Sequence, residues 1–144
     1  MYRTIAVATD GSETAGRALE AGLEMAERYG ARVVLISAYT GLPDWQTAPE
    51  RTSTLAEFQW ASHVRQEVDG ILAAALDQAR ARGLDGEIGA AEGEPADVIC
   101  GIAAEHEADL LVIGNKGIGR KVFGSVPRSV CAQAPCTVVL VKTT

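Results

Sequence analysis

A glycine-rich segment, residues 114–126, carries the strongest chemical signal in the sequence. It follows an apolar run from Leu110 to Ile113 and contains four glycines in thirteen residues. Because glycine has no Cβ, such a segment lets a ligand approach the backbone closely. It ends at Gly124-Ser125, where Ser125 is positioned to cap a helix that begins at Val126. Backbone N–H groups and the dipole of a helix N-terminus both favour an anion, so the pattern predicts a phosphate site.

The charge distribution supports this prediction. From Leu110 to Thr144 the chain contains no Asp or Glu, although its net charge is −6. The basic residues in this part of the chain are Lys116, Arg120, Lys121, Arg128 and Lys142. They form a local positive patch in an acidic protein. The alternative is that the glycines make only a tight turn and the basic residues only a solvated face.

Two common phosphate-binding motifs do not fit the segment. The pattern GxxxxGK[ST] requires Lys and then Ser or Thr after its second glycine, but Gly119 is followed by Arg120. The dinucleotide fingerprint GxGxxG fails because Val122 occupies the position of the third glycine. A phosphate bound here would therefore be held by a different kind of loop.

Length and composition predict one globular domain, residues 1–144. Hydrophobic residues make up 47% of the chain and charged residues 22%, which is typical of soluble domains. No apolar stretch has the length needed to cross a bilayer. The N-terminus lacks a signal-peptide pattern, so a cytoplasmic location is expected. The acidic balance argues against general nucleic-acid binding, which usually needs a broadly basic face.

The three cysteines are expected to be reduced core thiols, because each lies among apolar residues: Cys100, Cys131 and Cys136. Cys131 and Cys136 have no histidine near them in sequence, so no metal site is expected. The two histidines, His63 and His106, fall on or near predicted helices, away from the carboxyl ends of strands. The sequence therefore names no general base for catalysis.

Apolar runs and helical spacing alternate along the chain. The expected strands are Thr4–Thr9, Val33–Ala38, Glu87–Ala91, Leu110–Ile113 and Thr137–Val141. Four helices are expected. The first begins after its cap Ser12 and ends at Gly30, the second is Leu55–Arg82, the third begins at Pro95, and the fourth is Val126–Ala134. Residues Gly41–Thr54, which include two prolines, predict an exposed, mobile loop.

This alternation predicts an open, parallel, doubly wound sheet of five strands with four helices. The strands are near-continuous apolar runs, as expected when helices cover both faces. In such sheets ligands bind outside the carboxyl ends of the strands. The rule selects the loops at Asp10, at Ala38–Tyr39, at Glu92–Gly93 and at residues 114–124, without deciding which pair forms the crevice.

Two stretches of the chain resemble the universal stress protein family, and the likeness covers essentially the whole length. One is IAVATDGSETA, residues 5–15; the other is LLVIGNKG, residues 110–117, with GSVPRSVCAQAPCTVVLV, residues 124–141. The resemblance implies an adenine nucleotide alpha hydrolase-like fold with strand order 3-2-1-4-5. In that order strands 1 and 4 flank the crevice, which would bring Asp10 and the Gly114 loop together.

The nucleotide-binding branch of that family has a motif of Gly, two residues, Gly, nine residues, Gly, and then Ser or Thr. Gly114 and Gly117 match its first half, and Gly124-Ser125 match its second half. The spacer Ile118–Phe123 has six residues, three fewer than the motif. A nucleotide held here would therefore be crossed by a tighter loop than in that branch.

The resemblance also implies a role for individual residues. At the base, Asp10 would face the adenine, Ala8 would lie beside it, and Ala38 would offer backbone groups. The residues that it implies around the ribose and phosphates are Gly114, Gly117, Gly124, Ser125 and Val126. The positive patch adds Lys116 and Arg120 as expected phosphate contacts. For Asp10 the alternative is a turn residue that accepts hydrogen bonds from local N–H groups.

The function implied is that of a stress-response regulatory module that binds an adenine nucleotide and is not an efficient enzyme. ATP is the nucleotide expected first, and Mg²⁺ could bind together with it. AMP or cyclic AMP would use the same adenine contacts. Slow ATP hydrolysis remains open. The apolar fifth strand, Thr137–Val141, is expected to pair in a homodimer, because unprotected sheet edges invite association.

Two other functions compete with this one. One is a stress protein that binds a partner and no nucleotide. Only the short spacer Ile118–Phe123 favours it. A phosphorylation-receiver domain would also be a five-stranded α/β unit, and Asp10 and Lys142 fit it superficially. However, such a domain needs an Asp after strand 3, where this chain has Glu92-Gly93.

Overall fold

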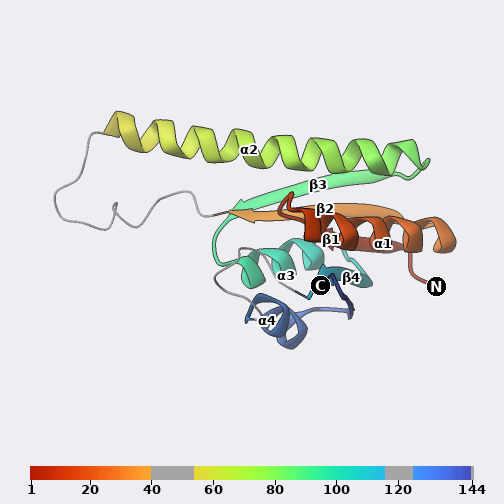
Figure 1. The fold of residues 1–144 in the computed structure, drawn as a ribbon. Coiled ribbons are helices and arrows are strands. Elements are labelled where there is room, and N and C mark those ends of the chain that lie inside the picture. The colour runs from red at the N-terminus through yellow and green to blue at the C-terminus, as the bar shows by residue number, and fades with distance from the viewer. Residues whose placement is uncertain (40–53, 116–124, 144) are drawn as a thin grey trace.

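The protein is a five-stranded parallel sheet with helices on both faces (Figure 1). The structure is a computed structural model that describes residues 1–39, 54–115 and 125–143, without the side chains of residues 54–61 and 125. Its strands are β1 Thr4–Ala8, β2 Arg32–Tyr39, β3 Gly86–Glu92, β4 Leu110–Gly114 and β5 Thr137–Val141. Its helices are α1 Glu13–Tyr29, α2 Thr54–Ala81, α3 Pro95–Glu105 and α4 Ser125–Gln133.

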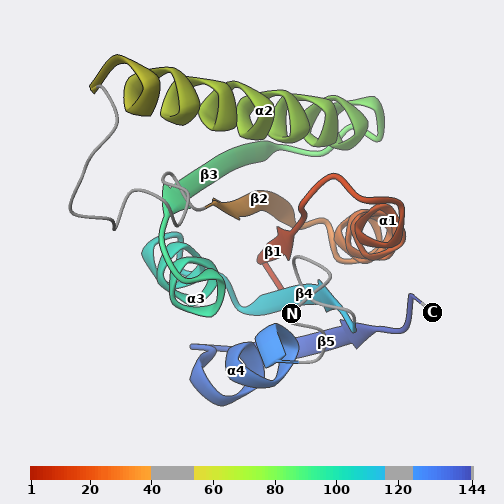
Figure 2. The same ribbon diagram turned by 60° about the vertical axis from the view of Figure 1, so that its left-hand side comes forward.

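The strand order β3-β2-β1-β4-β5 confirms the predicted doubly wound topology. Figure 2 shows this order from one edge to the other, with α1 and α2 on one side and α3 and α4 on the other. The predicted helices and strands are all present, with ends shifted by a residue or two. Most of the loop expected at Gly41–Thr54 lies outside the described residues, and α2 already begins at Thr54.

Two apolar cores lie on the two faces of the sheet, because successive side chains of a strand point to opposite sides. In β1, Ile5 and Val7 join the core under α1 and α2, whereas Ala6 and Ala8 join the core under α3 and α4. All five residues of β1 are buried. Burial on both faces accounts for the continuous apolar runs of the central strands.

The edge strands depart from the expectation that every strand is covered on both faces. Ile88 in β3 is 44% exposed and Leu140 in β5 is 50% exposed. Strands β3 and β5 are the edges of the sheet, so each lacks a neighbouring strand on its outer side. Near-complete burial therefore holds only for β1, β2 and β4.

Candidate functional site

The turn between β1 and α1 fixes the predicted acid, Asp10. The Oδ1 atom of Asp10 accepts the Ser12 N–H at 2.9 Å, and the Oγ atom of Ser12 accepts the Ala15 N–H at 3.1 Å as the N-cap of α1. The side chain of Asp10 thus has one oxygen engaged in the turn, as the turn interpretation of this residue expects. Its second carboxylate oxygen remains an acceptor that a ligand can use.

Gly11 holds the same turn in a conformation that other residues resist. Its φ is +81°, in the left-handed region. A Cβ added to Gly11 would lie 2.8 Å from Cγ1 of Ile71 in α2, so this loop packs directly against that helix. The position of Asp10 is therefore set from both sides, by α1 and by α2.

The end of β4 forms the opposite wall. Asn115 follows Gly114, and its backbone N–H donates to the Val141 carbonyl at 2.9 Å, which extends the β4–β5 ladder by one residue. A Cβ on Gly114 would lie 3.3 Å from Cγ2 of Thr143. Glycine thus lets Thr143 pack tightly over the end of β4.

Helix α4 supplies the third wall with its first turn. Val126 is 4% exposed, and Pro127 is also buried. The structure begins α4 at Ser125, so Ser125 is the first helical residue and not, as predicted, the residue before the helix. The first N–H groups of any α-helix lack partners within the helix, so this end of α4 can serve an anion.

These walls enclose a pocket at the carboxyl ends of β1 and β4. It is lined by Ala8, Asp10, Thr14, Ala15, Ile99, Ile113, Gly114, Val126, Pro127 and Thr143. Four of these residues, Ala8, Asp10, Gly114 and Val126, were predicted from the sequence. One side of the pocket is apolar, and Asp10 is the carboxylate among the lining residues.

The other predicted site residues are less directly placed. Ala38 is buried at the end of β2 and is not among the residues that line the pocket. Lys116, Gly117, Arg120 and Gly124 lie outside the described residues, as does the side chain of Ser125. Their roles remain predictions.

Sequence reasoning missed Thr14, Thr143 and the apolar wall from α3. Thr143 is 2% exposed and lies two residues beyond β5. A single threonine after an apolar strand belongs to no motif, so no signal in the sequence marks it. Ile99 of α3 also lines the pocket, and α3 packs beside α4 there.

The cysteines lie near α3 and α4, and only part of the expectation for them is correct. Cys100 is buried, and its thiol donates to the Val130 carbonyl at 3.8 Å. Burial raises the pKa of the Cys100 thiol above its ordinary value, and it does the same for the pKa of Cys136. Cys131 is exposed and is not a core residue, because it lies on the outer side of α4.

Within the described part of the chain, no group of three or more His, Cys, Asp or Glu side chains is arranged to hold a metal ion. Within the same residues, no helix is long and apolar enough to cross a membrane. His63 is exposed on α2, and His106 follows α3. Both histidines are therefore boundary or surface residues outside the pocket, as expected.

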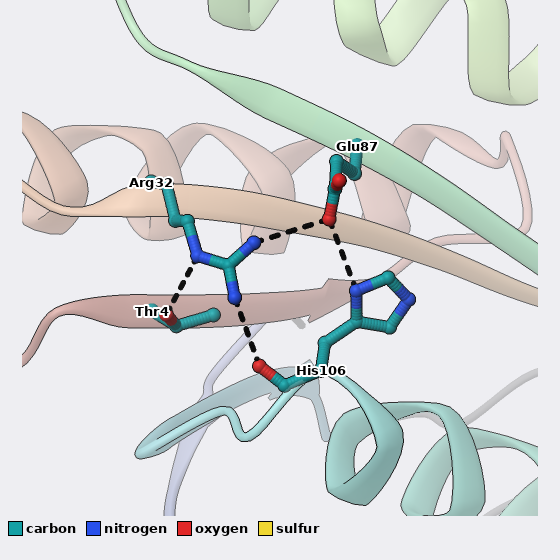
Figure 3. A network of polar contacts seen from close by, with 4 residues as sticks. All are labelled: Thr4, Arg32, Glu87 and His106. Carbon is teal, nitrogen blue, oxygen red and sulfur yellow. Dashed lines mark hydrogen bonds and ion pairs between the residues drawn. The ribbon is translucent and has the colours of Figure 1, made fainter.

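A second polar cluster occupies the opposite end of the sheet (Figure 3). The guanidinium of Arg32 donates to Oγ1 of Thr4 at 3.0 Å, to Oε1 of Glu87 at 3.1 Å and to the His106 carbonyl at 3.0 Å. Nδ1 of His106 lies 3.1 Å from the same Glu87 oxygen. These contacts join the amino ends of β1, β2 and β3 to the end of α3. The groups are mutually paired, which is typical of a structural network.

Fold and pocket define a doubly wound α/β protein with a pocket where the strand order reverses, between β1 and β4, the place at which ligands bind in such sheets. The family model of universal stress proteins matches residues 1–142. The chain therefore belongs to the universal stress protein family.

Individual relatives agree with this assignment. A universal stress protein of Thermus aquaticus is 32% identical over 146 residues, which span 99% of this chain and 100% of the relative. A crystal structure of a universal stress protein in complex with cAMP has a TM-score of 0.71 and 30% identity, covering 99% of this chain and 98% of that one. The universal stress protein of Archaeoglobus fulgidus in complex with dAMP has a TM-score of 0.71 and 29% identity, with 98% of both chains covered.

Family membership decides against the phosphorylation-receiver interpretation. The structure agrees, since β3 ends at Glu92 and is followed by Gly93, with no Asp at that turn. Two of these related structures contain an adenine nucleotide, cAMP in one and dAMP in the other.

Proposed function

We propose that this protein binds an adenine nucleotide in the pocket between β1 and β4 and acts as a regulatory module in a stress response. The observation that carries the proposal is the pairing of one carboxylate, Asp10, with an apolar wall formed by Ile99, Ile113 and Val126. An apolar wall suits a planar base, and a carboxylate suits the donor N–H of an exocyclic amino group.

The same carboxylate determines how the ligand lies. A phosphate would be repelled by Asp10 and attracted to the first turn of α4, where the helix dipole is positive. The base is therefore placed beside Asp10 and Ala8, with Ala38 nearby, and the phosphates are directed toward Gly114, Ser125 and Val126. The predicted contacts from Lys116, Gly117, Arg120 and Gly124 belong to the phosphate end.

ATP is the proposed ligand, and AMP or cyclic AMP would share its base contacts. Mg²⁺ usually binds through one or two carboxylates and the phosphates of its nucleotide, so it would arrive with ATP. We assign no catalytic residue to this pocket. We place the protein in the cytoplasm, as a single domain of residues 1–144.

Calorimetric titration of the purified protein with ATP, AMP, cyclic AMP and adenosine tests the proposal. Mass spectrometry of small molecules released on denaturation gives an independent reading of the natural ligand. An adenine nucleotide that binds and is recovered supports the proposal. A folded protein that binds none of the four ligands at low salt contradicts it and favours the partner-binding alternative.

A homodimer through β5 belongs to the same proposal. Thr137–Val141 lacks charged residues, and half of the Leu140 side chain is exposed at this sheet edge. A Leu140→Lys substitution should weaken dimerisation without entering either core. Ile88→Lys, at the opposite edge in β3, is the matched control because Ile88 is similarly exposed. Sedimentation of a wild-type monomer at micromolar concentration would exclude the dimer.

A further inference from the structure

The chain continues beyond β5 to its C-terminal end (Figure 2), and Thr143 there contacts Arg17 of α1; we call residues Lys142 and Thr143 the strap. Thr143 is fixed there by three hydrogen bonds. Its N–H and its hydroxyl each donate to Oδ1 of Asn115 at 2.9 Å, and its carbonyl accepts from Nη1 of Arg17 at 2.9 Å. The polar groups of Thr143 are thus engaged with two different elements, the turn after β4 and helix α1.

The side-chain amide of Asn115 can adopt only one orientation in this arrangement. A backbone N–H can only donate, so the atom of Asn115 that faces the Thr143 N–H must be the acceptor Oδ1. The Thr143 hydroxyl donates to the same oxygen. Two donors on one oxygen hold the Asn115 side chain more firmly than one would, because both must break before it turns.

Thr143 is also part of the pocket wall. Its methyl carbon Cγ2 lies 3.3 Å from the position of a Cβ on Gly114, and both residues line the pocket with Asp10. The strap therefore touches the point at which the chain leaves β4. In contrast, Asp10 is held by the Ser12 N–H, which does not involve Thr143.

We propose that Thr143, held by Arg17 and Asn115, is a positioning residue that sets the conformation of Gly114 and Asn115 for the phosphate part of a bound nucleotide. This inference rests on the proposed function, in which Gly114 lies beside the ribose and phosphates and Asp10 beside the base. Releasing the strap should therefore weaken contacts to the phosphates and leave contacts to the base in place.

Four variants separate the parts of the strap. Thr143→Val removes the hydroxyl and keeps the shape, whereas Thr143→Ser keeps the hydroxyl. Arg17→Met removes the donor to the Thr143 carbonyl, and Arg17→Lys keeps a donor. The control is Arg28→Met, on the same helix, because Arg28 forms an exposed pair with Glu24.

The measurement is the dissociation constant of each variant for ATP and for adenosine, with the free energy of unfolding in urea determined alongside. Thr143→Val and Arg17→Met should lower the affinity for ATP about threefold to tenfold, as expected for the loss of one hydrogen bond. They should change the affinity for adenosine by less than about twofold. The Ser, Lys and Arg28→Met variants should stay within about twofold for both ligands. A role in folding alone would lower the unfolding free energy without changing the ATP-to-adenosine ratio.

Three results would overturn the inference. An unchanged ratio in Thr143→Val and Arg17→Met, with wild type binding ATP, would refute the strap and leave the proposed function intact. Equal losses for both ligands that follow the loss of stability would do the same. Wild type that binds neither ligand would refute the proposed function and the strap together.

Discussion

The two ends of the sheet use polar residues in opposite ways. At the amino end, the guanidinium of Arg32 donates hydrogen bonds to Thr4, Glu87 and His106. Nearby, the Asp109 carboxylate accepts the backbone N–H groups of Arg3 and Thr4. At the carboxyl end, most residues that line the pocket are small or apolar. One carboxylate oxygen of Asp10 accepts the Ser12 N–H, and the other can accept a hydrogen bond from a ligand.

This difference separates residues that hold the fold together from residues that can meet a ligand. The side chains of Arg32, Glu87 and Asp109 at the amino end have their partners within the protein, so a ligand there would have to displace those partners. Parallel strands place the positive ends of α1 and α4 at the carboxyl end, where an anion is favoured. A charged residue by itself therefore does not indicate a ligand site. A charged group that keeps an atom free to bind a ligand is better evidence for one.

The largest effect on ligand binding is expected from Asp10→Asn. The Ser12 N–H would keep the amide oxygen, so the NH₂ group would replace the oxygen offered to the ligand, and two donors would face each other. We expect affinity for ATP and adenosine to fall about tenfold to a hundredfold, the range for a hydrogen bond to a charged group. Calorimetry measures the affinity, and urea unfolding should change by less than about 0.5 kcal/mol.

Asp77→Asn, on the exposed side of α2, is the matched control for this charge change. It should leave affinity and stability unchanged. Equal affinity of wild type and Asp10→Asn for adenosine would contradict the role of the second carboxylate oxygen and favour the turn interpretation of Asp10.

At the other end of the sheet, Arg32→Met should lower the free energy of unfolding by about 1–2 kcal/mol. The pair with Glu87 contributes little, because the two side chains are 39% and 55% exposed. Most of the loss comes from the Thr4 hydroxyl and the His106 carbonyl, which lose their donor. Urea denaturation tests the change, and ATP affinity should remain within about twofold.

If Arg32→Met lowered the affinity for ATP as strongly as Asp10→Asn does, the distinction between a structural amino end and a ligand-binding carboxyl end would be wrong. Arg28→Met, which removes an exposed pair within α1, should cost less than about 0.5 kcal/mol and provides the baseline.

A smaller effect is expected from Ser12→Ala, which removes the N-cap of α1 at the carboxyl end. The loss of the bond to the Ala15 N–H should cost about 1 kcal/mol in urea unfolding. Ser12→Thr retains a capping oxygen and should recover most of that stability. If Ser12→Ala and Ser12→Thr are equally stable, the cap observed at Ser12 does not stabilise the helix.

The smallest effects concern the cysteine thiols of α3 and α4. Alkylation at mildly alkaline pH should modify exposed Cys131 first and Cys100 last, because burial both shields Cys100 and raises its pKa. A raised pKa leaves less thiolate at a given pH, and the thiolate is the reactive form. Peptide mass spectrometry gives the order. Early modification of Cys100 in the folded protein would contradict its burial between α3 and α4.

Much of the fold could be predicted because its signals are local. The apolar runs of β1 and β4, the cap at Ser12 and the stop at Gly30 each specify an element without help from distant residues. The strand order came from the family resemblance, since alternation of elements alone does not fix it. The exposure of Ile88 and Leu140 depends on that order, because it makes β3 and β5 the edges.

The site was predictable where a loop follows a strand, as at Asp10 and Gly114. Contacts between distant segments were not predictable. Thr143 reaches the pocket through Asn115 and Arg17, the latter 126 residues away in sequence. Such contacts exist only after the sheet has formed, and no periodicity or spacing in the sequence encodes them.

Hydrogen exchange with and without saturating ATP tests most directly which end of the sheet binds the ligand. We predict slower amide exchange on binding in residues 9–15 and in the N-terminal part of α4, residues 125–130. Exchange should be unchanged at the amino end, in residues 2–5, 85–88 and 106–109. Protection at the amino end, or no protection at either end despite saturation, would contradict a nucleotide site between β1 and β4.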